Sequence, residues 1–493
     1  MSFLYSLITG RPSHKKRRLS ITPGAGYAPI PEDPTEPRTP ASLEQQITGV
    51  PPLGRGVKWV HFSLGAAVLL PWNAMITAMP YFLSRLEGSS LRSAFPSWLS
   101  TSFTAANFVV LAYATYTSDV AQSAIRIRLS TIAIILMFVL LTLSTLVPAS
   151  PSGYFAFAII MGMLLASAGS YTSNALVALA SIFGPMAMQS VMSGQAAIGV
   201  LVSLVQLISA WLSLAGSGST PAGAARSAFG FFGVGVIFLI GCLFSHGWLT
   251  SLRVYARAME PWMNGTVGNN TPALQGEEGE TTIGESVEST VTMGQKRDVR
   301  TLWKVARKNL TYNLAVGYVF IITLAVFPPI TTSIHSVHDP TSSMLFNPLI
   351  FNALHFFMFN IGDWTGRHLC TYPVFLTWKA RNLLVYSLSR TVFVPLFLMC
   401  NVEGFRAGTS PIINSDFLYM VILLFFGITN GHVSSNIMMA APSIEHNKKL
   451  LREEIDTAAT VASFCLMGGL LTGSILSFAV RGWICGCDPF IGG

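Results

Sequence analysis

Residues 355–367 read His-Phe-Phe-Met-Phe-Asn-Ile-Gly-Asp-Trp-Thr-Gly-Arg, which places an acid and a base in an otherwise apolar stretch. On a helix, four side chains of this stretch share one face: Phe356, Asn360, Asp363 and Arg367. An ionised side chain at bilayer depth costs about 2.5 to 3.5 kcal/mol on insertion scales, so the charged pair cannot face lipid. We therefore expect this face to turn toward a partner or a water-filled cavity and to mark the functional site.

Only 11% of the 493 residues are charged and 51% are hydrophobic, whereas an ordinary soluble domain is about 25% charged. Residues 129–225 contain no Asp, Glu, Lys or Arg, which is enough for about three membrane spans of roughly 20 residues each. The composition predicts an all-α polytopic membrane protein. The net charge of +8 then reflects basic residues on the cytosolic side, so no nucleic-acid partner is expected.

The six cysteines do not form a recognisable disulfide or metal-binding pattern. Four of them lie in or near apolar stretches and two lie close to the C-terminus: Cys242, Cys370, Cys400, Cys465, Cys485 and Cys487. We expect neither a metal nor a cofactor.

Hydrophobic windows predict eleven spans, near residues 57–83, 99–117, 129–148, 154–182, 187–214, 228–248, 311–334, 344–364, 382–400, 416–440 and 456–481. The N-terminal tail and the even-numbered loops hold 23 Lys and Arg residues. The odd-numbered loops and the C-terminal end hold five: Arg85, Arg92, Arg226, Arg406 and Arg481. Because basic residues stay on the cytosolic side, this bias predicts a cytosolic N-terminus and a C-terminus on the opposite side.

The same windows divide the chain into parts. Residues 1–56 contain many prolines and a basic run, and are expected to form a disordered cytosolic tail with a weak kinase motif at Ser20 and a weak sorting-adaptor motif at Tyr27. Residues 57–248 form a first bundle of six spans and residues 311–484 a second bundle of five. The polar segment 249–310 is expected to be a cytosolic linker loop, and residues 485–493 a short non-cytosolic C-terminus.

Polar side chains interrupt several spans of the first bundle. Pro71 bends the first span, and Trp72 and Asn73 follow it with a flat apolar ring and an amide. Asn174 and Gln195 lie in the fourth and fifth spans. We expect these four polar or aromatic side chains to contact substrate, with hydrogen bonding between helices as the alternative role of the amides.

The second bundle adds further polar groups around the charged face. Arg390 lies in the ninth span, so Asp363 has two candidate cationic partners. In the tenth span Asn430 offers an amide, and Gly431 permits a close approach between helices. His355 is expected to be a histidine satisfied within the bundle in preference to a proton relay.

Several motifs, in this order and spacing, resemble the equilibrative nucleoside transporter family. They are Leu70-Pro71-Trp72-Asn73 with Tyr81-Phe82, Met192-Ser193-Gly194-Gln195, Phe359-Asn360 through Asp363-Trp364 and Gly366-Arg367, Arg390 through Phe393-Val394-Pro395-Leu396 and Cys400-Asn401, and Asn430-Gly431. The resemblance runs from about residue 57 to residue 484.

The resemblance implies eleven helices in a major-facilitator-like arrangement of six plus five, alternating access, and facilitated movement of nucleosides, with nucleobases as a further class. It implies roles at the central cavity for Trp72, Asp363 and Arg367. The chain departs from many members at Asn174, where they carry glutamine, and at His432, where they carry tyrosine. With its proline-rich tail, the chain resembles a fungal member of the family. Its expected location is the vacuolar or endolysosomal membrane, or the plasma membrane.

Three other functions are compatible with parts of the pattern. A major-facilitator-type carrier of sugars or drugs would share the fold. A membrane-embedded enzyme could use Asp363 with His355, but the spans hold no paired carboxylates, metal-ligand spacing or Ser-His-Asp set. A receptor or scaffold would have no use for an ion pair within the membrane.

Overall fold

The computed structural model describes residues 53–214, 221–263, 299–327, 330–403 and 411–485. The described part is helical, apart from an isolated antiparallel bridge between Ile334 and Val402. The long helices are α3 Arg55–Thr77, α5 Leu91–Tyr116, α6 Ser123–Ser144, α7 Pro151–Phe183, α8 Pro185–Leu214, α9 Pro221–Ser251, α12 Leu310–Val326, α13 Pro348–Leu369, α16 Asp416–Ala440 and α17 Ile455–Cys485. Shorter helices are α4 Met79–Arg85, α10 Arg253–Met263, α11 Val299–Lys308, α14 Ala380–Ser389 and α15 Phe393–Leu398.

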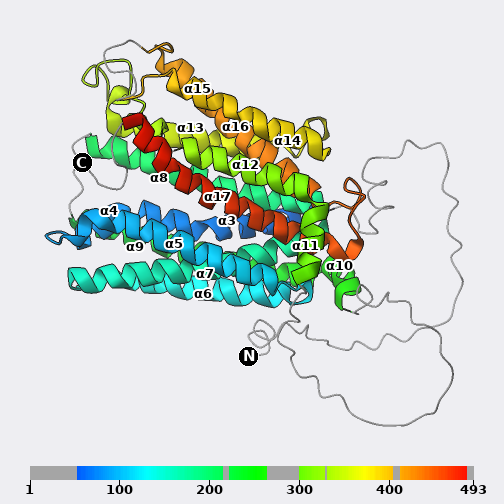
Figure 1. Cartoon of the computed structure of the whole chain (residues 1–493). Coiled ribbons are helices and arrows are strands. Elements are labelled where there is room, and N and C mark those ends of the chain that lie inside the picture. The colour runs from blue at the N-terminus through cyan, green and yellow to red at the C-terminus, as the bar shows by residue number, and fades with distance from the viewer. Residues whose placement is uncertain (1–52, 215–220, 264–298, 328–329, 404–410, 486–493) are drawn as a thin grey trace, which may run out of the picture.

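The helices form two groups that lie side by side (Figure 1). Helices α3, α5, α6, α7 and α9 occupy the lower half of the view and α12 to α16 the upper half, while α8 and α17 lie between them. The contacts agree with this view, because α8 packs on both α3 and α13, and α17 packs on both α12 and α7. The boundary between the two groups is therefore built mainly by α8, α13 and α17.

Eight of the described helical segments are long and apolar enough to cross a membrane. Three further expected spans coincide with helices outside that set, namely α5, α13 and the series α14–α15. Helix α13 is less apolar because it carries the charged pair of residues 363 and 367, whose side chains are buried. The chain is an integral membrane protein, since so many helices expose apolar side chains around its circumference.

Some helix boundaries differ from those expected. The first expected span is divided at Ala78 into α3 and α4. The ninth is divided by a short 3₁₀ segment, Arg390–Val392, between α14 and α15. Pro395 explains this break, because it has no N–H group to continue the helical hydrogen bonds to the preceding turn.

The expected linker loop also contains helices. Its two ends form α10 and α11, both strongly amphipathic, with basic side chains on one side and apolar side chains on the other. Such amphipathic helices are typical of a protein surface. Their many charged residues lower the average hydrophobicity, so a hydrophobic window does not detect them. The middle of this segment, residues 264–298, lies outside the described residues, as do Ser20, Tyr27 and the C-terminal residues 486–493.

Candidate functional site

The acid and the base of α13 form an ion pair inside the protein. Arg367 lies one helical turn after Asp363, and its Nε donates to Asp363 Oδ2 over 2.9 Å. Each residue is only 6% exposed. The geometry agrees with the sequence pattern, because side chains four residues apart lie above one another on a helix. Both charges are removed from water, so the pair is stable only if the other hydrogen-bonding atoms of the two side chains also have partners.

A line of polar side chains fills one of those positions. Asp363 Oδ1 accepts a hydrogen bond of 2.6 Å from Asn430 Nδ2 on α16. The carbonyl oxygen of the same amide accepts from Thr323 Oγ1 on α12 over 2.7 Å. Thr323 Oγ1 in turn accepts from Arg390 Nη1 over 3.0 Å. Arg390 therefore reaches the acid through two intervening side chains, whereas Arg367 contacts it directly.

Arg390 is held mainly by uncharged groups. Its guanidinium also donates to the backbone oxygens of Val319 and Phe426, over 3.0 and 3.2 Å, and lies 4.7 Å from the centre of the Phe426 ring. The side chain is 1% exposed. Carbonyl dipoles and an aromatic face stabilise a buried cation without neutralising it. Arg390 lies at the break between α14 and α15, and its hydrogen bonds connect this break to both α12 and α16.

Arg367 also joins the two halves of the molecule. Its Nη1 donates to the backbone oxygen of Met192 on α8 over 3.2 Å. In the other direction, Gln189 Nε2 of α8 donates to the backbone oxygen of Arg367 over 3.0 Å. Both bonds connect α8 of the first bundle to α13 of the second. Any separation of the bundles at this level must break them.

Glycines bring α13 and α16 close enough for these bonds. Gly362 and Gly366 on α13 face Gly427 and Gly431 on α16, each pair four residues apart. A Cβ atom on Gly431 would lie 1.9 Å from the backbone oxygen of Asp363, and one on Gly366 would lie 2.1 Å from that of Ile428. Helices in membranes use small residues in this way to approach one another closely. The short Asn430 side chain can then reach Asp363.

The residues expected around the first span have local contacts. Pro71 is buried inside α3. Trp72 is half-buried, with its ring centre 4.8 Å from that of Phe103 on α5. Asn73 Nδ2 donates to the backbone oxygen of Leu69, one turn earlier on its own helix. The amide of Asn73 is therefore hydrogen-bonded within α3. Part of the Trp72 ring remains exposed.

The remaining amides lie at contacts between or within helices. Asn174 is buried and its Nδ2 donates to Thr115 Oγ1 on α5 over 3.2 Å, while its carbonyl oxygen has no hydrogen-bond partner. Asn360 Nδ2 donates to the backbone oxygen of Phe356 on the same helix. Its carbonyl oxygen lies 2.7 Å from where a Cβ on Gly199 would be, so α8 approaches closely here. Gln195 is half-buried on α8, one to two turns beyond Gln189 and Met192.

Two histidines mentioned above have different surroundings. His355 is fully buried between aromatic rings of Phe327 and Phe356, and neither ring nitrogen has a hydrogen-bond partner. No acid is paired with it among the salt bridges of the described residues. His432 Nε2 lies 2.9 Å from the backbone oxygen of Phe375. Within the described residues, no hydrogen bond or salt bridge joins either histidine to the ion pair of α13.

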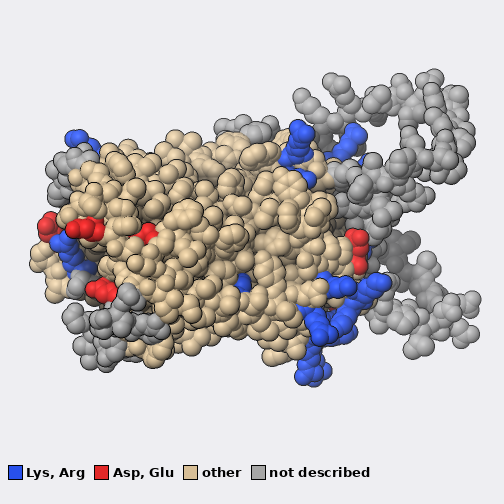
Figure 2. Space-filling model, turned by 90° about the horizontal axis from the view of Figure 1, so that it is seen from above, with Lys and Arg blue, Asp and Glu red and all other residues tan. Residues whose placement is uncertain are grey.

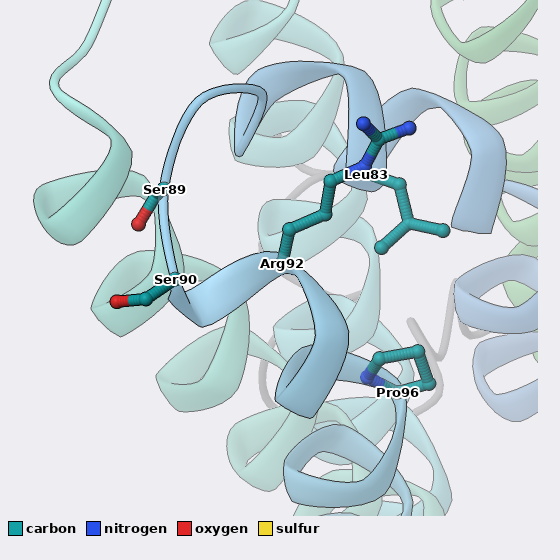
Figure 3. Close-up of a pocket in the computed structure, with 5 residues that line it drawn as sticks. All are labelled: Leu83, Ser89, Ser90, Arg92 and Pro96. Atoms are coloured by element: carbon teal, nitrogen blue, oxygen red, sulfur yellow. The ribbon is translucent and has the colours of Figure 1, made fainter. Parts of the chain in front are cut away.

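A surface pocket of about 430 Å³ lies elsewhere, beside the connection from α4 to α5 (Figure 3). It is shallow and is lined by Leu83, Ser89, Ser90, Arg92 and Pro96. None of the candidate site residues described above lines it. A single cation and an open shape give little basis for selective binding, so the site of interest remains the buried pair.

A protein-family model described as "Nucleoside transporter" matches residues 159–482. The rat protein "Equilibrative nucleoside transporter 2" is 31% identical over 459 residues, which cover 85% of this chain and 95% of the relative. The chain belongs to the nucleoside transporter family. The human "Equilibrative nucleoside transporter 1" is 27% identical over 87% of this chain and 97% of its own length. The yeast "Nucleoside transporter FUN26" is 27% identical over 85% of this chain and 82% of its own length.

The fold is shared more widely than the family. The structure of the major facilitator superfamily "proton:xylose symporter XylE" superimposes with a TM-score of 0.55 and 13% identity, covering 86% of both chains. At that identity the likeness concerns the fold alone, which is all-helical and of the major-facilitator type.

Sequence reasoning missed two residues of the site. Thr323 lies in an apolar span, where a lone threonine is ordinarily unremarkable, and Gln189 lies six residues before the Gln195 that was singled out. The available signal at both positions was a hydrogen-bonding side chain in a stretch expected to be buried.

Proposed function

We propose that this chain is a facilitative transporter that moves nucleosides, and nucleobases as a further class, across a membrane by alternating access. The observation that carries the proposal is the buried ion pair of Asp363 and Arg367 at the boundary between the two bundles, in a chain of the nucleoside transporter family. Since the relatives are transporters, the function is transport and not catalysis.

The chemistry of the site suits a nucleoside. Ribose hydroxyls both donate and accept hydrogen bonds, so Asp363 can accept from one and Arg367 can donate to another. A flat base needs an apolar wall, and we assign this role to the half-buried Trp72 ring, which packs on the buried Phe103. A hexose would use only the polar half of such a site.

We assign substrate contact to seven residues and support to five others. The contact residues are Trp72, Asn73, Asn174, Gln195, Asn360, Asp363 and Arg367. The supporting residues are Pro71, Gly366, Arg390, Asn430 and Gly431. Asn73, Asn174 and Asn360 make contacts within or between helices here, so their assignment requires them to exchange these bonds when substrate enters.

In alternating access, Arg367 has a second proposed role besides substrate contact, which is to connect the two bundles. Its bond to the backbone oxygen of Met192 joins the bundles, and the same guanidinium is proposed to bind substrate. A substrate hydroxyl competes with that backbone oxygen for the N–H group. Binding can thereby weaken the contact that must break when the bundles separate.

The direct test is uptake of radiolabelled uridine and adenosine by a strain that lacks its own nucleoside transporters, with competition by nucleobases and by glucose. We expect saturable uptake that unlabelled nucleosides inhibit and glucose does not. Inhibition by glucose alone would identify a sugar carrier instead.

Transport is expected to be passive. Asp363 is the acid of the site and has a direct cationic partner, whereas a proton-driven carrier needs an acid that changes partner. In proteoliposomes, uridine should reach the same concentration on both sides when a proton gradient is imposed. Accumulation against the uridine gradient would contradict this and would point to Asp363 or His355 as the proton carrier.

We further propose eleven spans arranged as six plus five. The six are α3, α5, α6, α7, α8 and α9, in residues 57–248, and the five are α12, α13, α14–α15, α16 and α17, in residues 311–484. The linker 249–310 and the tail 1–56 then face the cytosol, and residues 485–493 face the opposite side. The excess of Lys and Arg in the tail and even-numbered loops supports this orientation.

Reporter tags at the two ends test this topology. An odd number of spans places the N-terminal tag in the cytosol and the C-terminal tag on the other side of the membrane. Two cytosolic tags would mean an even number of spans.

The vacuolar or endolysosomal membrane and the plasma membrane are the proposed locations. A kinase acting at Ser20 and a sorting adaptor binding at Tyr27 are proposed on sequence motifs alone. Fluorescent tagging of the full chain distinguishes the two membranes, and a Tyr27→Ala variant that stays in the same membrane would dismiss the adaptor.

Trp72 provides a test of the apolar wall. We expect Trp72→Ala to raise the KM for uridine at least about fivefold, since aromatic contacts contribute on the order of 1 kcal/mol beyond their buried area. Trp72→Phe should be milder. A matched control is Trp59→Ala, because Trp59 lies on the same helix with 65% of its surface exposed. Loss of the Trp72→Ala protein from the membrane would instead make Trp72 a packing residue.

A further inference from the structure

Helix α11 has three distinct faces, which the transport function does not explain. Val305 is fully buried and faces the protein. Val299 and Trp303 are exposed on a second, apolar face, where 66% of the Trp303 surface is accessible. Lys304 and Arg307 are exposed on a third, basic face, which also includes position 300. Successive residues of a helix are rotated by about 100°, so the basic face lies directly beside the exposed apolar one.

The protein holds this helix firmly. Val305 packs in a small cluster with Leu450 and Ala458, which belong to the segment before α17 and to α17 itself. Lys308 forms an ion pair with Glu454, at 2.5 Å, in the same segment. The two exposed faces of α11 therefore have a fixed direction relative to the bundle.

The exposed apolar face continues into the membrane. Backbone hydrogen bonds from Asn309 to Val305 and from Asn313 to Asn309 carry the helical register from α11 into α12. Leu310 and Leu314 of α12 then share the face of Trp303, and they are 54% and 56% exposed. Because α12 is a membrane span, that face meets lipid. Trp303 lies seven residues before Leu310, about 10 Å along the axis, where tryptophan side chains meet the headgroups.

Basic residues gather at this end of the molecule. In Figure 2 Lys and Arg stand out at the right-hand end, where Figure 1 places α10 and α11, while the middle of the molecule is almost free of them. On α10, Arg253 and Arg257 are exposed one turn apart. Exposed acids nearby are Glu260 on α10, and Glu445 and Glu453 before α17. The same connection before α17 adds exposed Lys448, Lys449 and Arg452, so the local balance is positive.

We propose that the exposed faces of α11 form a binding site for anionic phospholipid. The Trp303 ring packs against the upper acyl chains, and Lys304, Arg307 and the basic position 300 contact the headgroup phosphate and carboxylate. An exposed apolar face beside a basic one is the pattern of a helix that lies at a charged membrane surface. This inference is independent of the transported substrate.

The test measures the lipid next to Trp303. Full-length protein is placed in phosphatidylcholine nanodiscs that contain either brominated phosphatidylserine or the same fraction of brominated phosphatidylcholine. Bromine quenches nearby tryptophan, and the difference between the wild type and Trp303→Phe isolates the signal of Trp303. We expect stronger quenching by the serine lipid and a smaller difference between the two lipids at high salt.

Charge variants decide whether α11 causes the preference. Replacing Lys304 and Arg307 with Gln should weaken phosphatidylserine binding about fivefold per cation, as expected for basic residues near an anionic surface. The matched control is Lys448→Gln with Lys449→Gln, two exposed cations in the α16–α17 connection that have no part in the α11 faces. Equal quenching by both lipids, no quenching, or an equal loss in the control would overturn the proposal. Competition by free inorganic phosphate that removes all preference would overturn it too.

Discussion

Asp363→Asn should abolish most uridine transport and also lower the amount of protein in the membrane. The substitution keeps the shape of the side chain but removes the negative charge that Arg367 contacts at 2.9 Å. Arg367 and Arg390 then remain as buried cations without an acid. Removing one partner of a buried ion pair costs about 3 to 5 kcal/mol, which is a large part of the stability of a typical domain.

Arg367→Ala should lose transport to the same degree with a smaller loss of protein. Asp363 retains its hydrogen bond from Asn430 and the positive charge of Arg390 beyond Thr323. The guanidinium proposed to contact substrate is missing, together with its bond to Met192. The difference in abundance between the two variants is therefore the informative quantity.

Fluorescence-detected size-exclusion chromatography gives the abundance of each variant, and uptake per molecule gives its activity. Asp339→Asn and Arg92→Ala serve as controls, because both residues are exposed and lie outside the site. Wild-type abundance together with normal uridine uptake in both site variants would mean that the pair neither supports the fold nor binds substrate.

Gly431→Ala is expected to lower both stability and transport, although it adds a single methyl group. The new Cβ would lie 1.9 Å from the backbone oxygen of Asp363 and 3.0 Å from the backbone nitrogen of Arg367. Backbone atoms cannot rotate away, so α13 and α16 must separate by about an ångström. Overpacking of this kind costs about 1 to 3 kcal/mol, and the separation would also lengthen the bond between Asn430 and Asp363.

Gly241→Ala on α9 is the matched control, because a Cβ there would meet no atom within 4 Å. It should be neutral or stabilising by up to about 1 kcal/mol, the difference in helix propensity between the two residues. Thermal unfolding in detergent and uridine uptake report on both variants. If Gly431→Ala unfolded at the wild-type temperature and transported normally, the close approach of α13 and α16 would have no importance for the site.

The sequence was sufficient where the physics is local or compositional. Hydropathy identified the membrane class because a run such as residues 129–225 has no other stable environment. The four-residue spacing placed Asp363 beside Arg367, since a helix brings those positions together whatever surrounds it. A glycine within a membrane span indicated that Gly431 allows a close approach between helices. Together the motifs were enough to identify the nucleoside transporter family.

Tertiary structure decided which groups complete the pair. The sequence left both Arg367 and Arg390 as partners of Asp363, and the fold assigns direct contact to the first and a connection through Asn430 and Thr323 to the second. The bonds between the bundles, from Gln189 and to the backbone oxygen of Met192, join residues more than 170 positions apart. Such contacts depend on which helices become neighbours and at what height, and no periodicity within a single helix carries that information.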